Sequence, residues 1–138
     1  MIERPLYMKK IAPFMDAPLA KIITGIRRSG KSTILEMVEK RLQERGVPKE
    51  KIFYAKFDSY EYERIDSGSE LYHAICEKLD GDGYYLLLDE VQEIEGWEKA
   101  VNSLMASKNA NVFITGSNSK LMSSEISTYL SGRYVVIP

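Results

Sequence analysis

A glycine-rich segment constrains the fold of this chain more than any other feature: residues 25–32 read GIRRSGKS. They fit the pattern G-x-x-x-x-G-K-[S/T], a loop whose backbone N–H groups surround phosphate oxygens at the start of a helix. The flanking sequence suits the pattern, because residues 21–24 predict a short buried strand and residues 33–45 predict an amphipathic helix. The segment therefore predicts a strand that leads through a phosphate-binding loop into a helix.

The types of residue in this segment suit a bound nucleotide. Gly25 allows a tight turn, and Gly30 allows the backbone to approach the phosphates closely. We expect Lys31 to place its charge on the β and γ phosphates and Ser32 to hold Mg²⁺ through its hydroxyl. The residues predicted to bind the nucleotide are Gly25, Ile26, Arg27, Arg28, Ser29, Gly30, Lys31, Ser32 and Thr33. The alternative is a glycine turn that caps a helix beside an exposed lysine.

Strand and helix patterns alternate along the rest of the chain. Strands are predicted at residues 51–57, 84–88, 111–115 and 134–137, and helices at 70–79, 97–107 and from 116–119 to about 130. This alternation predicts an α/β fold with a mostly parallel sheet and helices on both faces. Ligands of such sheets bind beyond the carboxyl ends of the strands. We therefore expect the segments after Thr24, Leu88 and Thr115 to meet at one edge.

Two carboxylates follow the apolar strand at residues 84–88. Asp89 is predicted to bind the metal ion, directly or through water, because hard cations prefer carboxylate oxygens. Glu90 is predicted to polarise and orient the water that attacks the nucleotide. The alternative is that both carboxylates begin a solvated loop, since acidic side chains are mostly exposed.

Length and composition limit the other possibilities. The chain has 138 residues and a formal net charge of −1, so we expect one domain and find no argument for non-specific binding to nucleic acid or an anionic membrane. No apolar run approaches the roughly 20 residues that span a bilayer. The one cysteine, Cys76, excludes an internal disulfide, and no apolar signal region follows the N-terminal charges. These features predict a cytoplasmic protein.

Three segments together resemble a known family. In chain order they are GIRRSGKST, YYLLLDEVQEIEGWEKAV and VFITGSNSKLMSSEISTYLSGRY, and they resemble a large prokaryotic family of AAA-type P-loop ATPases in the additional-strand, catalytic-glutamate division. The resemblance covers roughly residues 4–137. It implies a three-layer P-loop NTPase fold whose five-stranded sheet has the order 5-1-4-3-2, with ATP and Mg²⁺ as ligands and ATP hydrolysis as the activity.

The resemblance also implies roles for three further residues. Thr115 or Ser117 would sense the γ phosphate or hold the attacking water, although Ser117 also suits the cap of the following helix. Arg133 would act as an arginine finger toward the nucleotide of a neighbouring subunit, which implies self-association. The alternative is that Arg133 interacts with the negative C-terminal end of the preceding helix.

The sequence is also compatible with two other functions. The second hypothesis is a nucleotide-gated switch that turns over slowly, and the third is a P-loop kinase for a small molecule. Members of the family generally continue into a winged-helix-like segment and a C-terminal domain of unknown function, so we expect this chain to be an ATPase core from a longer protein. A DNA or protein partner is equally compatible with the sequence, and selectivity for adenine rests on the resemblance alone.

Overall fold

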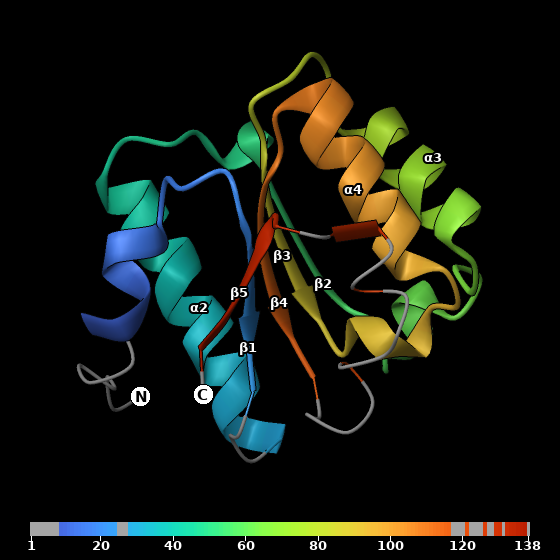
Figure 1. The fold of residues 1–138 in the computed structure, drawn as a ribbon, viewed down its shortest axis with the longest axis horizontal. Helices are drawn as coiled ribbons and strands as arrows, with labels where there is room; N and C mark the ends of the chain where they lie inside the picture. Colours follow the sequence, from blue (N-terminus) through green and yellow to red (C-terminus); the bar gives the residue numbers. More distant parts are fainter. Residues whose placement is uncertain are drawn as a thin grey trace.

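Five parallel strands form a single sheet in the order β2-β3-β4-β1-β5 (Figure 1). The structure is a computed structural model that describes residues 9–24, 28–116, 121, 126, 129–130 and 132–137, with the backbone alone for residues 28–32. The strands are β1 (Ala20–Ile23), β2 (Ile52–Lys56), β3 (Tyr85–Asp89), β4 (Asn111–Thr115) and β5 (Tyr134–Ile137). The predicted α/β fold and strand order are confirmed.

Helices cover both faces of the sheet (Figure 1). Helix α2 (Arg28–Glu44) lies on one face, and α3 (Gly68–Lys78) and α4 (Trp97–Lys108) lie together on the other. Short 3-10 helices complete the connections: η1 (Ala12–Phe14), η2 (Lys49–Lys51), η3 (Tyr60–Tyr62) and η4 (Val91–Glu93). Each face of the sheet therefore has its own apolar core, as expected for parallel strands that are buried on both sides.

The end of α2 shows how local sequence determines an element boundary. Gly46 has φ +94°, and its N–H donates to the Gln43 carbonyl at 3.0 Å. The Val47 N–H donates to the Leu42 carbonyl, also at 3.0 Å. This pair of bonds is a Schellman motif, which needs a left-handed residue that glycine adopts without steric cost. The motif ends α2 at Glu44, one residue before the predicted end of this helix at residue 45.

The third strand differs from its predicted limits by one residue. It begins at Tyr85 and includes Asp89, whereas the apolar run alone predicted residues 84–88. The Asp89 carbonyl accepts a bond from the Phe57 N–H at 3.0 Å. Because Asp89 lies inside the strand, its position is set by the sheet and not by a loop.

The segment before the first strand packs against the α2 face of the sheet. Ile11 is fully buried and Met15 is 4% exposed, and both belong to the core that α2 shares with the sheet. The segment that contains Ile11 and Met15 therefore packs against the sheet. Residues 1–8 lie outside the described part of the chain. No helix among the described residues is long and apolar enough to cross a membrane.

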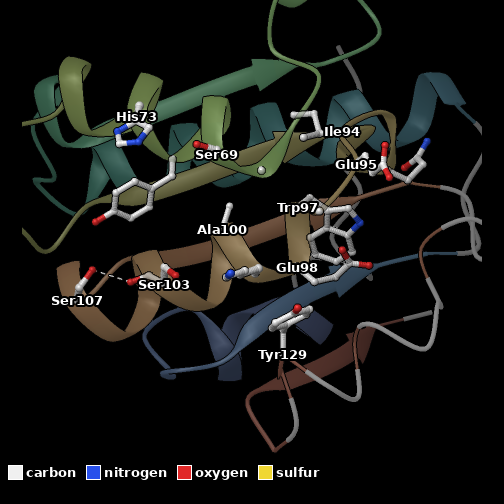
Figure 2. Close-up of a pocket in the computed structure, with 15 residues that line it drawn as sticks. Ser69, His73, Ile94, Glu95, Trp97, Glu98, Ala100, Ser103, Ser107 and Tyr129 are labelled. Carbon is white, nitrogen blue, oxygen red and sulfur yellow. Dashed lines mark hydrogen bonds between the residues drawn. The ribbon is translucent and has the colours of Figure 1, made fainter.

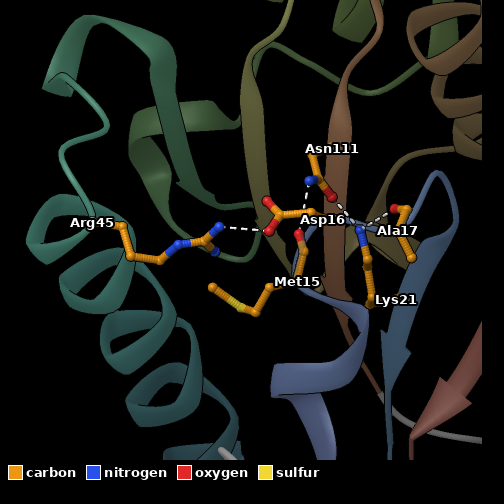
Figure 3. Close-up of polar contacts among 6 residues, drawn as sticks. All are labelled: Met15, Asp16, Ala17, Lys21, Arg45 and Asn111. Carbon is orange, nitrogen blue, oxygen red and sulfur yellow. Dashed lines mark hydrogen bonds and ion pairs between the residues drawn. The ribbon is translucent and has the colours of Figure 1, made fainter.

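A buried lysine joins this segment to the amino end of the sheet (Figure 3). Lys21, in β1, is fully buried, and its Nζ donates to the Ala17 carbonyl at 2.7 Å and to the Asn111 side-chain oxygen. The Asn111 amide in turn donates to the Met15 carbonyl at 2.7 Å. Burial lowers the pKa of Lys21 to about 8, while the negative charge of Asp16 opposes this shift. The sequence did not predict this network.

Raising the pH is expected to stabilise the wild-type protein relative to Lys21→Met. Lys21 loses its proton near pH 8 in the folded state but near 10.5 when unfolded, so the unfolded state binds more protons between these values. The free energy of unfolding must then rise with pH, and the neutral amine can still donate both hydrogen bonds. We expect a relative gain of about 2 kcal/mol between pH 7 and 9.5 in urea unfolding. A pH-independent difference between the two proteins would contradict the assignment.

Candidate functional site

The strand register brings the predicted site segments to one edge of the sheet. Thr115, the last residue of β4, pairs with Ile23 of β1 on one side and with Asp89 of β3 on the other. All five strands run parallel, so their carboxyl ends share this edge, and α2 begins beside it at Arg28 (Figure 1). The strand ends at Ile23, Asp89 and Thr115 therefore lie side by side. Residues 25–27 and 117–120, which follow two of these strands, lie outside the described residues, so their meeting stays a prediction.

A buried hydrogen bond connects the ends of β3 and β4. The Thr115 hydroxyl donates to Asp89 Oδ1 at 2.5 Å, and the two residues are 0% and 3% exposed. Short bonds of this kind are typical of a hydroxyl that donates to a charged carboxylate. Thr115 therefore orients Asp89. The sequence did not predict this hydrogen bond. The role of Thr115 as a phosphate sensor stays a prediction.

Glu90 is held in an unusual backbone conformation. Its φ of +58° and ψ of +43° lie in the left-handed region, which few residues other than glycine adopt. Its N–H donates to the Thr115 carbonyl at 3.0 Å, and its carboxylate accepts a bond from the Gln92 side-chain amide. Glu90 is 7% exposed, so the alternative in which both carboxylates begin a solvated loop is wrong.

The electrostatic surroundings of Asp89 include the neighbouring strand. Burial raises the pKa of the Tyr54 phenol, and the negative charge of Asp89 raises it further. Tyr54 therefore stays neutral at physiological pH and adds no second negative charge beside the carboxylate.

The start of α2 provides a place for an anion. Residues 28–32 form the beginning of the helix, where the first N–H groups lack partners within the helix and the helix dipole is positive. The first turn contains no acidic residue that would compete for these groups. Gly25, Ile26, Arg27 and Ser117 lie outside the described residues, and the directions of the Lys31 and Ser32 side chains are not described. Their roles stay predictions.

Arg133 lies at the opposite end of the strands, the amino end of the sheet. It directly precedes β5, and its carbonyl accepts a bond from the Ala20 N–H at 2.8 Å, at the amino end of β1. Its exposed side chain donates to the Asn102 side-chain oxygen on α4 at 3.0 Å. The four residues of β1 span about 13 Å between this end of the strands and their carboxyl end. Arg133 is therefore remote from Asp89 and Thr115 of its own chain.

A cavity of about 960 Å³ lies over α3 and α4 (Figure 2). Tyr72 and His73 of α3 line it, together with Trp97 and Ser103 of α4. Gln92, whose amide binds Glu90, also lies in its wall. The sequence analysis did not select Gln92. Its position between two apolar residues that prove to be buried, Val91 and Ile94, was a signal that could have found it.

Comparison with known proteins agrees with this arrangement. The family model described as AAA domain matches residues 18–138. An uncharacterized protein of Haemophilus influenzae is 42% identical over 139 residues, covering 99% of this chain and 35% of the relative. Uncharacterized protein MJ1544 of Methanocaldococcus jannaschii is 35% identical over 116 residues, covering 82% of this chain and 24% of the relative.

The chain thus spans about a third and about a quarter of the lengths of these two relatives. No solved structure matches it. The family match covers the strand before the phosphate loop, both carboxylates and the last strand. The chain belongs to the AAA domain family of P-loop ATPase-like proteins.

Proposed function

We propose that this chain binds ATP with Mg²⁺ and hydrolyses it at the carboxyl edge of the sheet. The observation that carries the proposal is the buried bond between Thr115 and Asp89, which lies next to Glu90 and on the same edge as the start of α2. The family match supports a nucleotide-binding, ATPase-like function at a coarser level. A phosphate site beside two buried carboxylates suits an attack of water on a phosphoryl group.

The side chains around Asp89 fit a magnesium ion. Mg²⁺ is usually held by one or two carboxylates together with water and substrate phosphates, not by a cage of protein ligands. Among the described residues no group of three or more His, Cys, Asp or Glu side chains gathers. A single carboxylate oriented by Thr115, with the Ser32 hydroxyl as a proposed further ligand, would suit this chemistry. The ion would neutralise charge on the phosphates.

The remaining roles follow from position. The first N–H groups of α2 and the Lys31 ammonium would bind the phosphates, and Glu90 would accept a proton from the attacking water. Burial of Glu90 limits competition from bulk solvent for that water. Thr115, with Ser117 as the second candidate, would respond to the γ phosphate.

Turnover by a single chain is expected to be slow. Arginine fingers contribute several orders of magnitude to the rate of phosphoryl transfer in some P-loop proteins. Arg133 lies at the edge opposite to Asp89, so it would act only on the nucleotide of a second copy of the chain. This position favours a slow, nucleotide-gated switch as the second candidate function.

Mg²⁺-dependent release of phosphate from ATP tests the proposal. We expect the wild type to release phosphate, and Lys31→Ala to weaken ATP binding by about 10- to 100-fold because a charged hydrogen-bond donor is lost. Lys49→Ala, which changes an exposed lysine in η2, is the matched control and should behave as wild type. Tight ATP binding with no phosphate release above the Lys31→Ala level would favour the switch. No binding of ATP by the wild type would overturn both.

A further inference from the structure

Gln92 contacts the carboxylate that is proposed to activate water. It lies in η4, two residues after Glu90, and its Nε2 donates to Glu90 Oε2. Its neighbours anchor the turn, since Val91 is fully buried and Ile94 is 1% exposed. Gln92 therefore donates to a buried carboxylate from a turn that two buried apolar side chains fix in place.

The other end of the same amide is unsatisfied. Gln92 Oε1 is buried and accepts no hydrogen bond within the described part of the chain. A buried acceptor without a donor is unfavourable and calls for an explanation. Rotating the amide by 180° would bring Oε1 against a Glu90 carboxylate oxygen and place two acceptors in contact. The bond to Glu90 therefore determines the orientation of the amide, at the expense of Oε1.

Gly116 has no side chain, and the Gln92 amide occupies the space where its Cβ atom would lie. A Cβ atom built on Gly116 would overlap Gln92 Oε1 and would approach the Leu121 side chain to 2.9 Å. Gly116 directly follows Thr115, whose hydroxyl binds Asp89. The end of β4 thus supports both carboxylates: Thr115 binds Asp89, and Gly116 allows Gln92 to bind Glu90.

We propose that Gln92 is a positioning residue that holds the Glu90 carboxylate in the orientation for the attacking water, and that Gly116 is required for this contact. The inference rests on the proposed function, because it assigns Gln92 a part in hydrolysis. Gln92 acts through Glu90 and is not assigned a contact with the nucleotide. Its loss should therefore change kcat and leave KM for ATP almost unchanged.

The substitution Gln92→Met tests the donor specifically, because methionine keeps the length of the side chain and loses the N–H. We expect kcat for ATP hydrolysis to fall about 10- to 100-fold, the effect of losing a hydrogen bond to a charged group, with KM within about twofold of wild type. Glu93→Gln, which changes the exposed next residue of η4, is the matched control and should keep the wild-type kcat. A wild-type kcat in Gln92→Met would overturn the inference.

A double substitution separates positioning from packing. Gly116→Ala should displace the Gln92 amide and lower kcat by a similar factor. If both changes act by removing the same contact, Gly116→Ala combined with Gln92→Met should be about as slow as either alone. Losses that multiply in the double variant, with all proteins folded in unfolding measurements, would overturn the shared mechanism.

A readout without hydrolysis distinguishes this inference from the proposed function. In ¹H–¹⁵N NMR spectra of the nucleotide-free protein, the Gln92 side-chain NH₂ signals should move when Glu90→Gln replaces the charged acceptor. Unmoved signals would overturn the contact itself, whatever the activity. Moved signals in a protein that binds ATP without hydrolysing it would overturn the proposed hydrolysis and the role of Gln92 in it, and would support the contact alone.

Discussion

Replacing Glu90 with glutamine is expected to lower the rate of ATP hydrolysis by about 10²- to 10⁴-fold, the usual contribution of a general base. Binding of ATP should persist, because the start of α2 and the phosphate loop are unchanged. Glutamine has the same shape and can still accept the hydrogen bond from Gln92 through its side-chain oxygen. The left-handed backbone at this position is equally available to both residues, so stability should change little. Phosphate release under single-turnover conditions gives the rate, and titration with ATP gives the affinity.

The experiment also separates the two carboxylates. Asp89 accepts a hydrogen bond from the Thr115 hydroxyl and is proposed to bind the metal ion. Asp89→Asn should therefore lower the rate and also raise the Mg²⁺ concentration that gives the half-maximal rate. Glu90→Gln should leave that Mg²⁺ concentration unchanged. If Glu90→Gln hydrolysed ATP at the wild-type rate, Glu90 would not be the base.

Replacing Gly68 with alanine is expected to destabilise the protein by about 3 kcal/mol, the upper range for inserting an atom into a closely packed site. A Cβ atom on Gly68 would overlap the Gly96 carbonyl oxygen and lie 2.9 Å from its carbonyl carbon. Both groups are backbone, so neither can rotate away. The Gly68 N–H also donates to the Glu95 carbonyl at 2.8 Å, which holds the starts of α3 and α4 together.

The sign of this effect distinguishes packing from helix propensity. Gly68 is the first residue of α3, and alanine is favoured over glycine within helices by about 1 kcal/mol. Propensity alone therefore predicts a small gain in stability. Ser69→Ala, one residue further along the same helix, is the matched control and should alter the free energy of unfolding by less than about 1 kcal/mol. A stabilised Gly68→Ala protein would show that the two helix starts can separate at little cost.

The fold was largely predictable because its elements have local patterns. The apolar runs at β3 and β4 and the glycine at the end of α2 each depend on residues close in the chain. The sheet order was different: it came from the resemblance to a family, since no local pattern states which strands are neighbours. Strand boundaries shifted by at most one residue, whereas α2 begins five residues before its predicted start and α3 begins two residues before. For Asp89 the one-residue shift of β3 moved the carboxylate from a loop into a strand.

The site was predictable in its residue types but not in its contacts. Asp89 and Glu90 were recognised from the strand that they follow, yet their burial and their partners were not. Thr115 lies 26 residues from Asp89 in the chain, and the bond between them exists because β3 and β4 are neighbours with these two residues in register. Gln92 and Gly116 meet for the same reason, since each follows the end of one of these two strands.

The sequence by itself determined that a strand leads through a phosphate-binding pattern into a helix, and that two carboxylates follow another strand. These are local features, set by hydrophobic periodicity and by the conformational freedom of glycine. Only the tertiary structure decided that Glu90 is buried, that Gln92 binds it, and that Arg133 lies at the far edge. The physical reason is that strand order and register, which bring distant residues together, depend on packing of the whole sheet.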